Sequence, residues 1–390
     1  MESILNNKLF FILMIISKIV ISQNISVIDS VSESIFDYIS YDFYEPNSFT
    51  INDSSIYIGT IDRTYCLKIN DSLSDIKRID FRGKYIRQDG HLLVNAYLDV
   101  YNIKNDEIFK FFDFSSVKRY TEAINFYVKD SLVFIFQQGE NSLHDYYGFK
   151  IYDLRTKKYI DTNLTKVLTE FKKTFTDVGS IYIKDQFLYL MSLTSVHDPY
   201  IISKIDYVQD KIINRLSSEY GYNFVGEDIF GNIILYDNFK LRNNLCFIFT
   251  DLKEIFNIDM DKLIKKLSLM KNNKYFEDRT GLEPSIFASI NENNELFFMI
   301  ITVRGVYFIK LNYLNYLKDY YSKKSTDELR IVRNTIFARK GRAFNSEDLQ
   351  EYFSNQSWYK VNSNYSDSLL TDFDISCINF IKDIEKEKSK

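Results

Sequence analysis

The chain has 390 residues, enough for one large domain or two smaller ones. Hydrophobic residues make up 45% and charged residues 26%, which excludes wholesale disorder and fibrous repeats. The 49 Lys and Arg against 53 Asp and Glu give a formal charge of −4, so there is no global positive field to drive nucleic-acid binding. With 12 glycines but 30 tyrosines and 33 phenylalanines, the composition favours strands and leaves few phosphate-cradling loops.

Residues 1–22 have the pattern of a secretory signal peptide. A short polar start ends at Lys8, an apolar run follows from Leu9 to Ile16, and Lys18 interrupts it. A bilayer span needs about 20 mostly apolar residues, so this run is too short. Val20 and Ser22 fit the positions before a cleavage site, which predicts cleavage before Gln23. The alternatives are an uncleaved anchor and a buried first strand. We expect an exported protein (periplasmic, cell-surface or secreted) with no transmembrane span in the mature chain.

The region 23–315 is predicted to be a β-propeller. Three pairs of β-rich runs are joined by Asn, Asp or Lys turns: 124–130 with 132–136, 181–185 with 187–190, and 285–291 with 296–300. Six similar runs end in an acidic or amide residue: 65–70, 100–105, 149–153, 202–206, 247–251 and 307–312. Their spacing of roughly 35 to 60 residues is that of propeller blades. We predict five to seven blades. The alternative is a β-sandwich or a large open sheet.

Three helices are predicted within or directly after this region. Residues 163–176 place Leu164, Val167, Leu168 and Phe171 at helical spacing, and residues 259–271 carry a similar stripe. Both stripes are interpreted as packing faces rather than partner grooves. A third helix, about 311–321, is expected to link to the C-terminal module, with its tyrosines leaning on the propeller.

The C-terminal residues predict a small all-α module. Ser325 and Glu328 form a capping box before a helix with Leu329, Val332 and Ile336 on one side. Gly341 supplies the left-handed stop of that helix. A second helix starts after Ser346, the single tryptophan Trp358 follows it, and a last helix begins near Thr371. Residues 387–390 are expected to be a solvated tail.

This stretch resembles the YARHG domain, a module of exported bacterial proteins. The matching residues are 333–342, Phe344, 349–353 and Trp358 with Tyr359, and the resemblance covers about 326–386. Phe337 and Lys340 stand where the family name has Tyr and His. The resemblance implies an extracytoplasmic location and leaves the chemistry open, because the biochemical role of the family is unsettled.

Five residues of this module are candidate binding residues. Arg339, Lys340 and Arg342 form a compact cationic group suited to an anionic envelope polymer or a carboxylate. The structural interpretation is favoured: cations at a helix C-terminus stabilise it by roughly 0.3–1 kcal/mol each, and Arg339 bonds the Trp358 loop internally. Trp358 offers a stacking surface for a sugar, but a lone Trp in so small a module is more often core; the adjacent Tyr359 of the motif is the fifth candidate.

No catalytic residue, metal site or cofactor is assigned from the sequence. The three cysteines, Cys66, Cys246 and Cys377, lie far apart in apolar contexts and are interpreted as buried free thiols, with one long-range disulfide as the alternative. His91, His144 and His197 lie in separate strand-and-turn segments, and the two His-Asp pairs, at 144–145 and 197–198, are interpreted as solvated loop residues.

The preferred hypothesis is an exported, YARHG domain-containing binding or scaffold protein without enzymatic activity. Its expected partner is a cell-envelope polymer or an envelope protein, and not nucleic acid. The alternative is an envelope hydrolase of glycan or peptide with its site in the propeller channel; carboxylates crowding a channel mouth would favour it. A third hypothesis is a structural partner subunit that uses the helical insertions.

Overall fold

The computed structural model of the chain describes its strands and C-terminal helices and part of the connections between them. The described residues are 25–31, 48–52, 55–60, 63–68, 77–83, 85–110, 124–138, 147–160, 162, 164–174, 177–193, 199–218, 221, 223–237, 244–248, 255–259, 285–302, 305–356 and 358–389. The predicted signal peptide, almost all of the predicted helix at 259–271, His144 and His197 lie outside these ranges, as does the side chain of Cys246.

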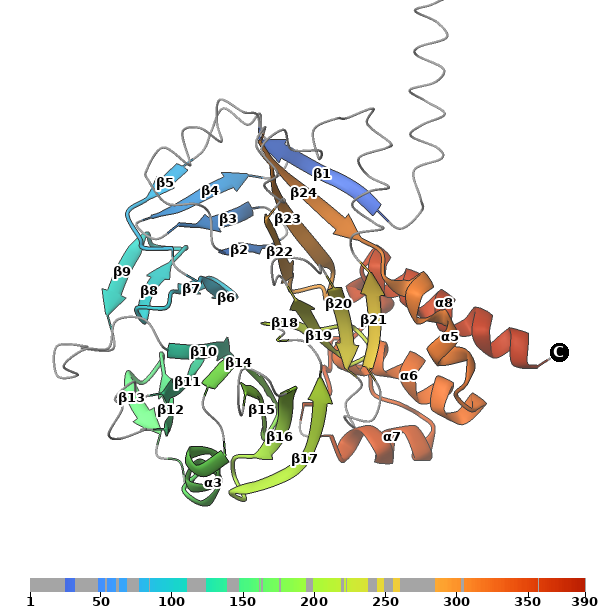
Figure 1. Cartoon of the computed structure of the whole chain (residues 1–390). Helices are drawn as coiled ribbons and strands as arrows, with labels where there is room; N and C mark the ends of the chain where they lie inside the picture. Colours follow the sequence, from blue (N-terminus) through green and yellow to red (C-terminus); the bar gives the residue numbers. More distant parts are fainter. Residues whose placement is uncertain are drawn as a thin grey trace, which may run out of the picture.

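The described strands form six antiparallel sheets of four strands each, arranged radially as a β-propeller (Figure 1). The first two blades contain β2 (Ser48–Ile51), β3 (Ser55–Gly59), β4 (Thr64–Lys68) and β5 (Lys77–Ile79), and then β6 (Arg87–Asp89), β7 (Leu92–Val94), β8 (Asp99–Asn102) and β9 (Glu107–Lys110). The third and fourth contain β10 (Ile124–Lys129), β11 (Leu132–Gln138), β12 (Tyr147–Asp153) and β13 (Lys158–Ile160), and then β14 (Asp177–Lys184), β15 (Phe187–Leu193), β16 (Tyr200–Asp206) and β17 (Lys211–Ser218). The fifth contains β18 (Asn223–Glu227), β19 (Ile233–Asp237), β20 (Asn244–Ile248) and β21 (Ile255–Asp259).

The sixth blade closes the ring with strands from both ends of the propeller. It contains β22 (Ser285–Ile290), β23 (Leu296–Thr302) and β24 (Gly305–Leu311), and its outermost strand is β1 (Ile25–Val31). β1 pairs antiparallel with β24 in a register that joins Ile25 to Leu311 and Val31 to Val306. Because the N-terminal strand completes the last blade, the ring is closed by backbone hydrogen bonds.

The sequence pattern located three strands in blades three, four and six, but only the third strand in blades one, two and five. The predicted hairpins at 124–136, 181–190 and 285–300 are β10–β11, β14–β15 and β22–β23. The six similar runs overlap the third strands of the blades. Outer strands such as β9 and β13 carry mostly exposed side chains. They make no apolar run, so the pattern gave no signal for them. The first strands of neighbouring blades contact one another around the centre (Figure 1).

The core lies between the blades and consists of aromatic and aliphatic side chains. Between blades three and four, Phe134 and Phe149 pack with Ile181 and Leu190. The helix α3 (Lys166–Thr174) covers this cluster with Val167 and Phe171, which confirms the predicted packing stripe. Buried side chains of this size contribute roughly 1.5–3 kcal/mol each.

The start of α3 is held by a turn of the neighbouring blade. The carboxylate of Asp210, in the β16–β17 turn, accepts hydrogen bonds from the backbone N–H groups of Thr165, Lys166 and Val167 at 2.7–3.1 Å. These N–H groups have no partner within the helix, so an acidic side chain from outside caps it. These bonds outweigh the burial of Asp210 and lower the pKa of its carboxyl.

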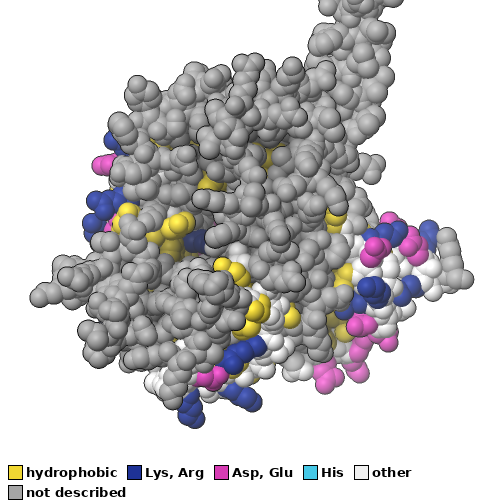
Figure 2. Space-filling view, in the orientation of Figure 1, with side chains coloured by type: hydrophobic (Ala, Val, Ile, Leu, Met, Phe, Trp, Pro, Cys, Tyr) yellow, Lys and Arg dark blue, Asp and Glu magenta, His cyan; other side chains and the backbone are white. Residues whose placement is uncertain are grey.

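The C-terminal region is helical. It contains α5 (Leu314–Ser322), α6 (Thr326–Arg339), α7 (Glu347–Ser354), the 3-10 turn η2 (Asp367–Leu369) and α8 (Asp372–Lys388). The predicted capping box of Ser325 and Glu328 is present, and a second one joins Thr371 and Asp374. Gly341 has φ +86, the left-handed conformation expected after α6. Charges of both signs are interspersed over this region on the face shown in Figure 2.

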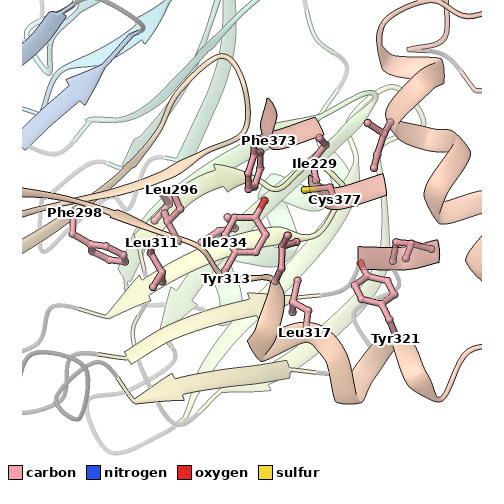
Figure 3. Close-up of a cluster of buried hydrophobic side chains, with 14 of the residues drawn as sticks. Ile229, Ile234, Leu296, Phe298, Leu311, Tyr313, Leu317, Tyr321, Phe373 and Cys377 are labelled. Atoms are coloured by element: carbon pink, nitrogen blue, oxygen red, sulfur yellow. The ribbon is translucent and has the colours of Figure 1, made fainter. Parts of the chain in front are cut away.

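The C-terminal helices are packed on the propeller through a shared core (Figure 3). Tyr313 and Tyr321 at the two ends of α5 are buried, in agreement with the predicted contact of these tyrosines with the propeller. They lie with Cys377 of α8 and with Ile229 and Leu296 of blades five and six. Cys377 is a buried free thiol, as predicted, whereas the free thiol of Cys66 is half-buried. Among the described residues, no helix is long and apolar enough to cross a membrane.

A candidate binding cleft between the propeller and the C-terminal helices

An open cleft of about 670 Å³ lies between one face of the propeller and the C-terminal helices. Its propeller side is formed by turns and strand ends of four blades, including Lys129, Asp130, Lys184, Asp185, Tyr207, Glu227, Glu292 and Asn294. Its other side is formed by Ile336, Arg339, Lys340, Trp358, Lys360 and Asp374. A concave site of this size, with polar groups from two parts of the chain, is suited to a small ligand.

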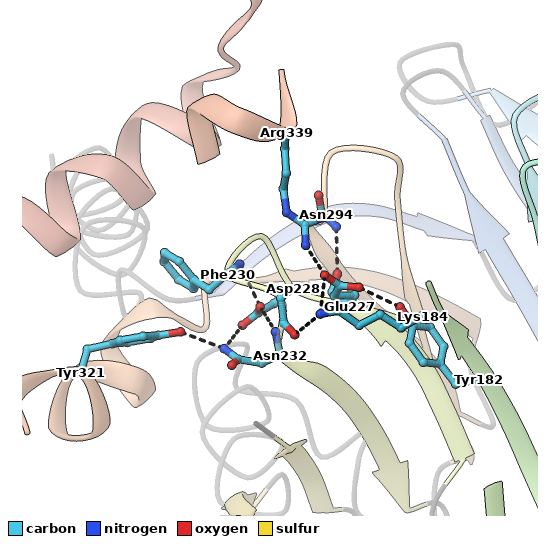
Figure 4. A network of polar contacts seen from close by, with 10 residues as sticks. Tyr182, Lys184, Glu227, Asp228, Phe230, Asn232, Asn294, Tyr321 and Arg339 are labelled. Atoms are coloured by element: carbon cyan, nitrogen blue, oxygen red, sulfur yellow. Dashed lines mark hydrogen bonds and ion pairs between the residues drawn. The ribbon is translucent and has the colours of Figure 1, made fainter. Parts of the chain in front are cut away.

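Glu227, the last residue of β18, is held by charged groups from both sides of the cleft (Figure 4). Lys184 Nζ donates to Glu227 Oε1 at 3.0 Å and to the carbonyl of Gly231 at 2.7 Å. Arg339 Nη2, from the end of α6, donates to the same Oε1, and Tyr182 Oη donates to Oε2 at 3.2 Å. Glu227 therefore joins blade four, blade five and the C-terminal helices.

The trio of Glu227, Lys184 and Arg339 is poorly exposed and remains charged. The exposed fractions of these side chains are 10%, 14% and 26%. Burial alone would raise the pKa of Glu227, but Arg339 and Lys184 outweigh it and hold this pKa at about 2. Burial lowers the pKa of Lys184, and Glu227 offsets part of that effect. Glu227 is thus an ion-pair acceptor at neutral pH and not a proton donor.

Asp228, the next residue, lies in a different environment. Its side chain is wholly buried and accepts hydrogen bonds from the N–H groups of Phe230 at 2.9 Å and Asn232 at 2.7 Å. Asn232 Nδ2 donates to the second carboxyl oxygen at 2.7 Å and to Tyr321 Oη of α5 at 2.9 Å (Figure 4). Burial raises the pKa of Asp228 to about 7. Asp228 does not line the cleft.

Trp358 forms part of the cleft wall through contact with Arg339. The Arg339 guanidinium carbon lies 5.6 Å from the centroid of the Trp358 ring, a cation–π distance. Trp358 also packs edge-on against the buried Phe353, with ring centroids 6.0 Å apart. The predicted internal contact between Arg339 and the Trp358 loop is present. Trp358 is half-buried, so one part of it belongs to the small core and another part lines the cleft.

The other three candidate residues have internal partners. Lys340 Nζ lies 3.1 Å from Asp374 Oδ2, which is almost fully buried at the start of α8. The Arg342 guanidinium carbon lies 4.9 Å from the centroid of the Phe337 ring, and the carbonyl of Arg342 accepts a hydrogen bond from Tyr359 Oη at 2.6 Å. Of the five predicted residues, the structure brings Arg339, Lys340 and Trp358 to the cleft, whereas Arg342 and Tyr359 do not line it.

Sequence reasoning missed the propeller half of the site. Lys184 and Glu227 each end the first strand of a blade, and their positions in the chain, 43 residues apart, give no sign that they meet. The sequence contains one weak signal: both are charged residues at the end of a first strand. In a propeller the ends of the first strands lie on the same face, so such residues are candidates for a common site. Asp374, in the first turn of α8, is the partner of Lys340, a contact that the sequence did not indicate.

Polar and aromatic side chains also line the centre of the propeller. Arg87 of β6 reaches across to β18, where one of its Nη atoms donates to the carbonyl of Phe224 at 3.2 Å. A smaller cavity of about 130 Å³ is lined by both residues. The rings of Tyr127 and Tyr182 meet edge-on with centroids 4.8 Å apart, and Tyr182 bonds Glu227. Through Tyr182, the aromatic side chains at the centre of the propeller contact Glu227 of the cleft. Among the described residues, no cluster of His, Cys, Asp and Glu is placed to hold a metal ion.

Comparison with known proteins identifies the C-terminal part of the chain. Residues 305–386 match the model of the YARHG domain. The match begins in β24 and includes α5, so it is longer than the predicted stretch at 326–386. No curated protein matches the chain.

Three of the similar solved structures are the Pan2 WD40 domain of Neurospora crassa, the Dos1 propeller, and PorZ of Porphyromonas gingivalis. The first has 8% identity and a TM-score of 0.44, over 75% of this chain and 96% of that one. The second has 10% identity and a TM-score of 0.38, over 69% and 79%. PorZ, a bacterial surface component of the type-IX secretion system, has 8% identity and a TM-score of 0.36, over 71% and 32%. The chain combines a six-bladed β-propeller with a C-terminal region that matches the YARHG domain and begins within the last blade.

Proposed function

We propose that this chain is an exported cell-envelope or extracellular binding protein that holds its ligand in the cleft between the propeller and the C-terminal helices. The observation that carries the proposal is the joint construction of the cleft. Glu227 of the propeller is fixed between Lys184 and Arg339, so the C-terminal helices hold one wall against the other. The match to a domain of exported proteins, together with the sequence of residues 1–22, supports the location.

A binding role agrees with the chemistry of the two best-held carboxylates in the cleft. Glu227 and Asp374 are each bonded to a cation of the opposite wall or the neighbouring helix. Glu227 joins the two walls through Arg339, and both carboxylates are fixed in position. Fixed walls favour binding, because little conformational entropy is lost when a ligand enters a preformed site.

The alternative proposal is an envelope hydrolase, because further carboxylates do gather at the cleft. Asp130, Asp185 and Glu292 all lie on its propeller side. Hydrolysis of a glycosidic bond requires one carboxyl to act as an acid. Glu227 does not meet that requirement with a pKa of about 2, and the protonatable Asp228 is buried behind it. Neither of these two carboxyls supplies the acid, and binding is the function that we propose first.

The test is recovery of the full-length mature protein on isolated cell-envelope fractions. We expect the wild type to be retained and the double variant Trp358→Ala/Lys360→Glu to be retained several-fold less, because both changes alter the cleft wall. The matched control is Lys382→Ala on α8, since Lys382 is exposed and does not line the cleft. Equal recovery of all three proteins would remove the cleft from the binding role. Release of sugar or peptide fragments from the fractions by the wild type would favour the hydrolase.

Point variants are preferable to removal of the C-terminal helices. Tyr313, Tyr321 and Cys377 share one buried cluster with propeller residues, so truncation would expose an apolar surface of the propeller. Loss of binding after truncation would then report aggregation as readily as loss of the site.

A further inference from the structure

The charged side chains of the cleft fall into two groups, those with an ion pair and those without one. Lys184, Arg339 and Lys340 are bonded to Glu227 and Asp374. The second group has two cations, Lys129 and Lys360, and three acids, Asp130, Asp185 and Glu292; none of the five has an ion pair with another residue in the described part of the chain. Asp130, Glu292 and Lys360 are exposed, and Lys129 and Asp185 are half-buried.

The second group offers both signs of charge to a ligand. Lys129 and Asp130 come from the β10–β11 turn of blade three, Asp185 from the β14–β15 turn of blade four, Glu292 from the β22–β23 turn of blade six, and Lys360 from the loop after α7. A ligand of one sign would be attracted by one set of these groups and repelled by the other. A ligand that carries both an ammonium and a carboxylate gains from the acids and from the cations.

The remaining wall adds an apolar, flat contact and an incompletely satisfied cation. Trp358 lines the cleft beside the Arg339 guanidinium. Arg339 Nε is buried and has no hydrogen-bond partner among the described residues, so Glu227 does not saturate this guanidinium. An aromatic wall next to charged groups suits the short aliphatic side chains and peptide planes of a small peptide.

From these features we infer that the cleft binds a short zwitterionic peptide with a free ammonium and a free carboxylate. This statement rests on the proposed function and specifies its ligand. The volume of about 670 Å³ fits a ligand of a few residues. An extended tripeptide separates its terminal charges by roughly 7–10 Å, which allows each end to meet a different wall.

The single tryptophan makes the test specific for the site. Because Trp358 is the only tryptophan of the chain, its fluorescence reports the cleft wall without labelling. The probes are tri-alanine and Ala-Lys-Ala with free ends, the C-terminal amide and the N-acetyl form of tri-alanine, and the uncharged trisaccharide chitotriose. We expect a saturable change of Trp358 fluorescence with the free peptides at concentrations of up to about 10 mM. Capping either end of tri-alanine is expected to weaken binding about two- to fivefold, because each cap removes one charge pair that is partly screened by solvent.

Variants separate the charge from the stacking contribution. Lys360→Glu replaces a cation of the cleft by an anion and keeps Trp358, so it is expected to weaken the free peptide about two- to fivefold and not to weaken the C-terminal amide, whose only charge is the ammonium. Lys382→Ala is the matched control and is expected to leave the titration unchanged. Higher salt is expected to reduce the difference between free and capped peptides.

Three results would overturn the inference: no saturable signal with either free peptide, equal affinities for free and capped peptides, or a fluorescence change with chitotriose that equals that of the peptides. Retention on envelope fractions is measured separately. If retention depends on the cleft while the free peptides fail, the binding role stands and only the peptide assignment is wrong. If retention is independent of the cleft, the proposed function itself fails.

Discussion

Two turns on the same face of the propeller have the same backbone and different chemistry. In the β18–β19 turn, the N–H of Asp228 donates to the carbonyl of Asn232, and the N–H of Gly231 donates to the carbonyl of Asp228. In the β22–β23 turn, Asn291, Asn294 and Glu295 make the same two bonds. In each turn the first residue also accepts two backbone N–H groups with its side-chain oxygen. An amide and a carboxyl thus do the same work for the backbone.

A third copy of the turn, between β7 and β8, shows what the backbone alone requires. Asn95 accepts the N–H groups of Tyr97 and Asp99 at 2.9 Å each. Asn is therefore sufficient at the first position of the β7–β8 and β22–β23 turns. Only the β18–β19 turn of these three has a carboxyl, Asp228, at that position. Its second oxygen accepts from Asn232, which in turn bonds Tyr321 of α5. The carboxyl serves the contact with the C-terminal helices in addition to the turn.

The comparison also explains why two adjacent carboxyls respond to pH in opposite directions. Cations hold the pKa of Glu227 at about 2, whereas burial without a cation raises the pKa of Asp228 to about 7. The contribution of Glu227 to stability is present above its unfolded value of about 4.5 and is lost as pH falls toward 2. The proton on Asp228 stabilises the folded chain at low pH, and this contribution is lost as pH rises from about 4 to about 7.

The largest effect is expected from Glu227→Ala, which removes the anion and leaves Lys184 and Arg339 close together. Removing one partner of a buried ion pair costs about 3–5 kcal/mol. We expect this loss in the free energy of unfolding at pH 7, measured with urea. Glu292→Ala, in the β22–β23 turn, is the control. Glu292 is exposed, so we expect the free energy of unfolding to change by less than about 0.5 kcal/mol. Similar losses for both variants would mean that the trio does not hold the cleft walls.

The second largest effect is expected from Asp228→Asn, which gives the β18–β19 turn the residue found at this position in the β22–β23 and β7–β8 turns. At pH 8 the folded wild type has to keep this buried carboxyl ionised. The amide removes that cost, and we expect stabilisation by roughly 2–4 kcal/mol, provided that the Asn232 amide reverses to accept from the new Nδ2. The gain should shrink as pH falls from 7 to 4, and urea unfolding at several pH values measures it. Lower stability of the variant at pH 8 would contradict the assignment.

The reverse exchange, Asn291→Asp, sharpens the same comparison. Asn291 Nδ2 donates to Glu295 Oε2 at 3.0 Å, so a carboxyl at position 291 would face another carboxyl. We expect a loss of about 1–3 kcal/mol at pH 8 and a smaller loss at pH 4, measured in the same way. Equal stability of this variant and the wild type would show that the two turns are chemically interchangeable.

The sequence predicts the propeller better than it predicts how the parts meet. The spacing of apolar runs located β10, β11, β14, β15, β22 and β23, because a strand buried on both faces must be apolar along its length. Outer strands such as β9 expose most of their side chains and left no such signal. The predicted residues 326–386 of the C-terminal module fall within the match at 305–386, because caps and a turn glycine are local features.

The candidate site was only half predictable, for a physical reason. Arg339 and Trp358 were found because a helix end and a lone tryptophan are visible in the sequence. Glu227 and Lys184 become a site only because blades four and five place two strand ends beside α6. Contacts between blades depend on the closure of the ring, and no local sequence pattern predicts which residues meet when the ring closes. The positions of Arg342 and Tyr359 outside the cleft follow equally from tertiary packing.

A smaller effect is expected from a substitution at Gly231, the fourth residue of the β18–β19 turn. Gly231 has φ +90, whereas the corresponding Leu98 and Asn294 have φ +58 and +59. A Cβ at position 231 would lie 3.1 Å from Lys184 Nζ and 3.4 Å from Glu227 Oε1. We expect Gly231→Ala to cost about 1–2 kcal/mol in urea unfolding, from the backbone conformation and from crowding of the ion pair. The control is Gly90→Ala, because Gly90 also has a positive φ, +55, but a Cβ there would have no atom within 4 Å. If both variants lose the same amount, crowding at Glu227 is not involved.

The smallest effect is expected from Tyr321→Phe, which tests whether the carboxyl of the first turn is linked to α5. The variant removes one hydrogen bond, from Asn232 Nδ2 to Tyr321 Oη, and leaves the ring in the core, so we expect a loss of about 1 kcal/mol. Tyr316→Phe is the control, because Tyr316 is half-buried on the same helix and its hydroxyl has no hydrogen bond within the described part of the chain. The decisive measurement is the double variant with Asp228→Asn. Reversal of the Asn232 amide changes its bond to Tyr321, so the change in the free energy of unfolding of the double variant should differ from the sum of the two single changes by about 0.5 kcal/mol or more. Additive changes would mean that Asp228 serves its own turn alone, like Asn291 and Asn95.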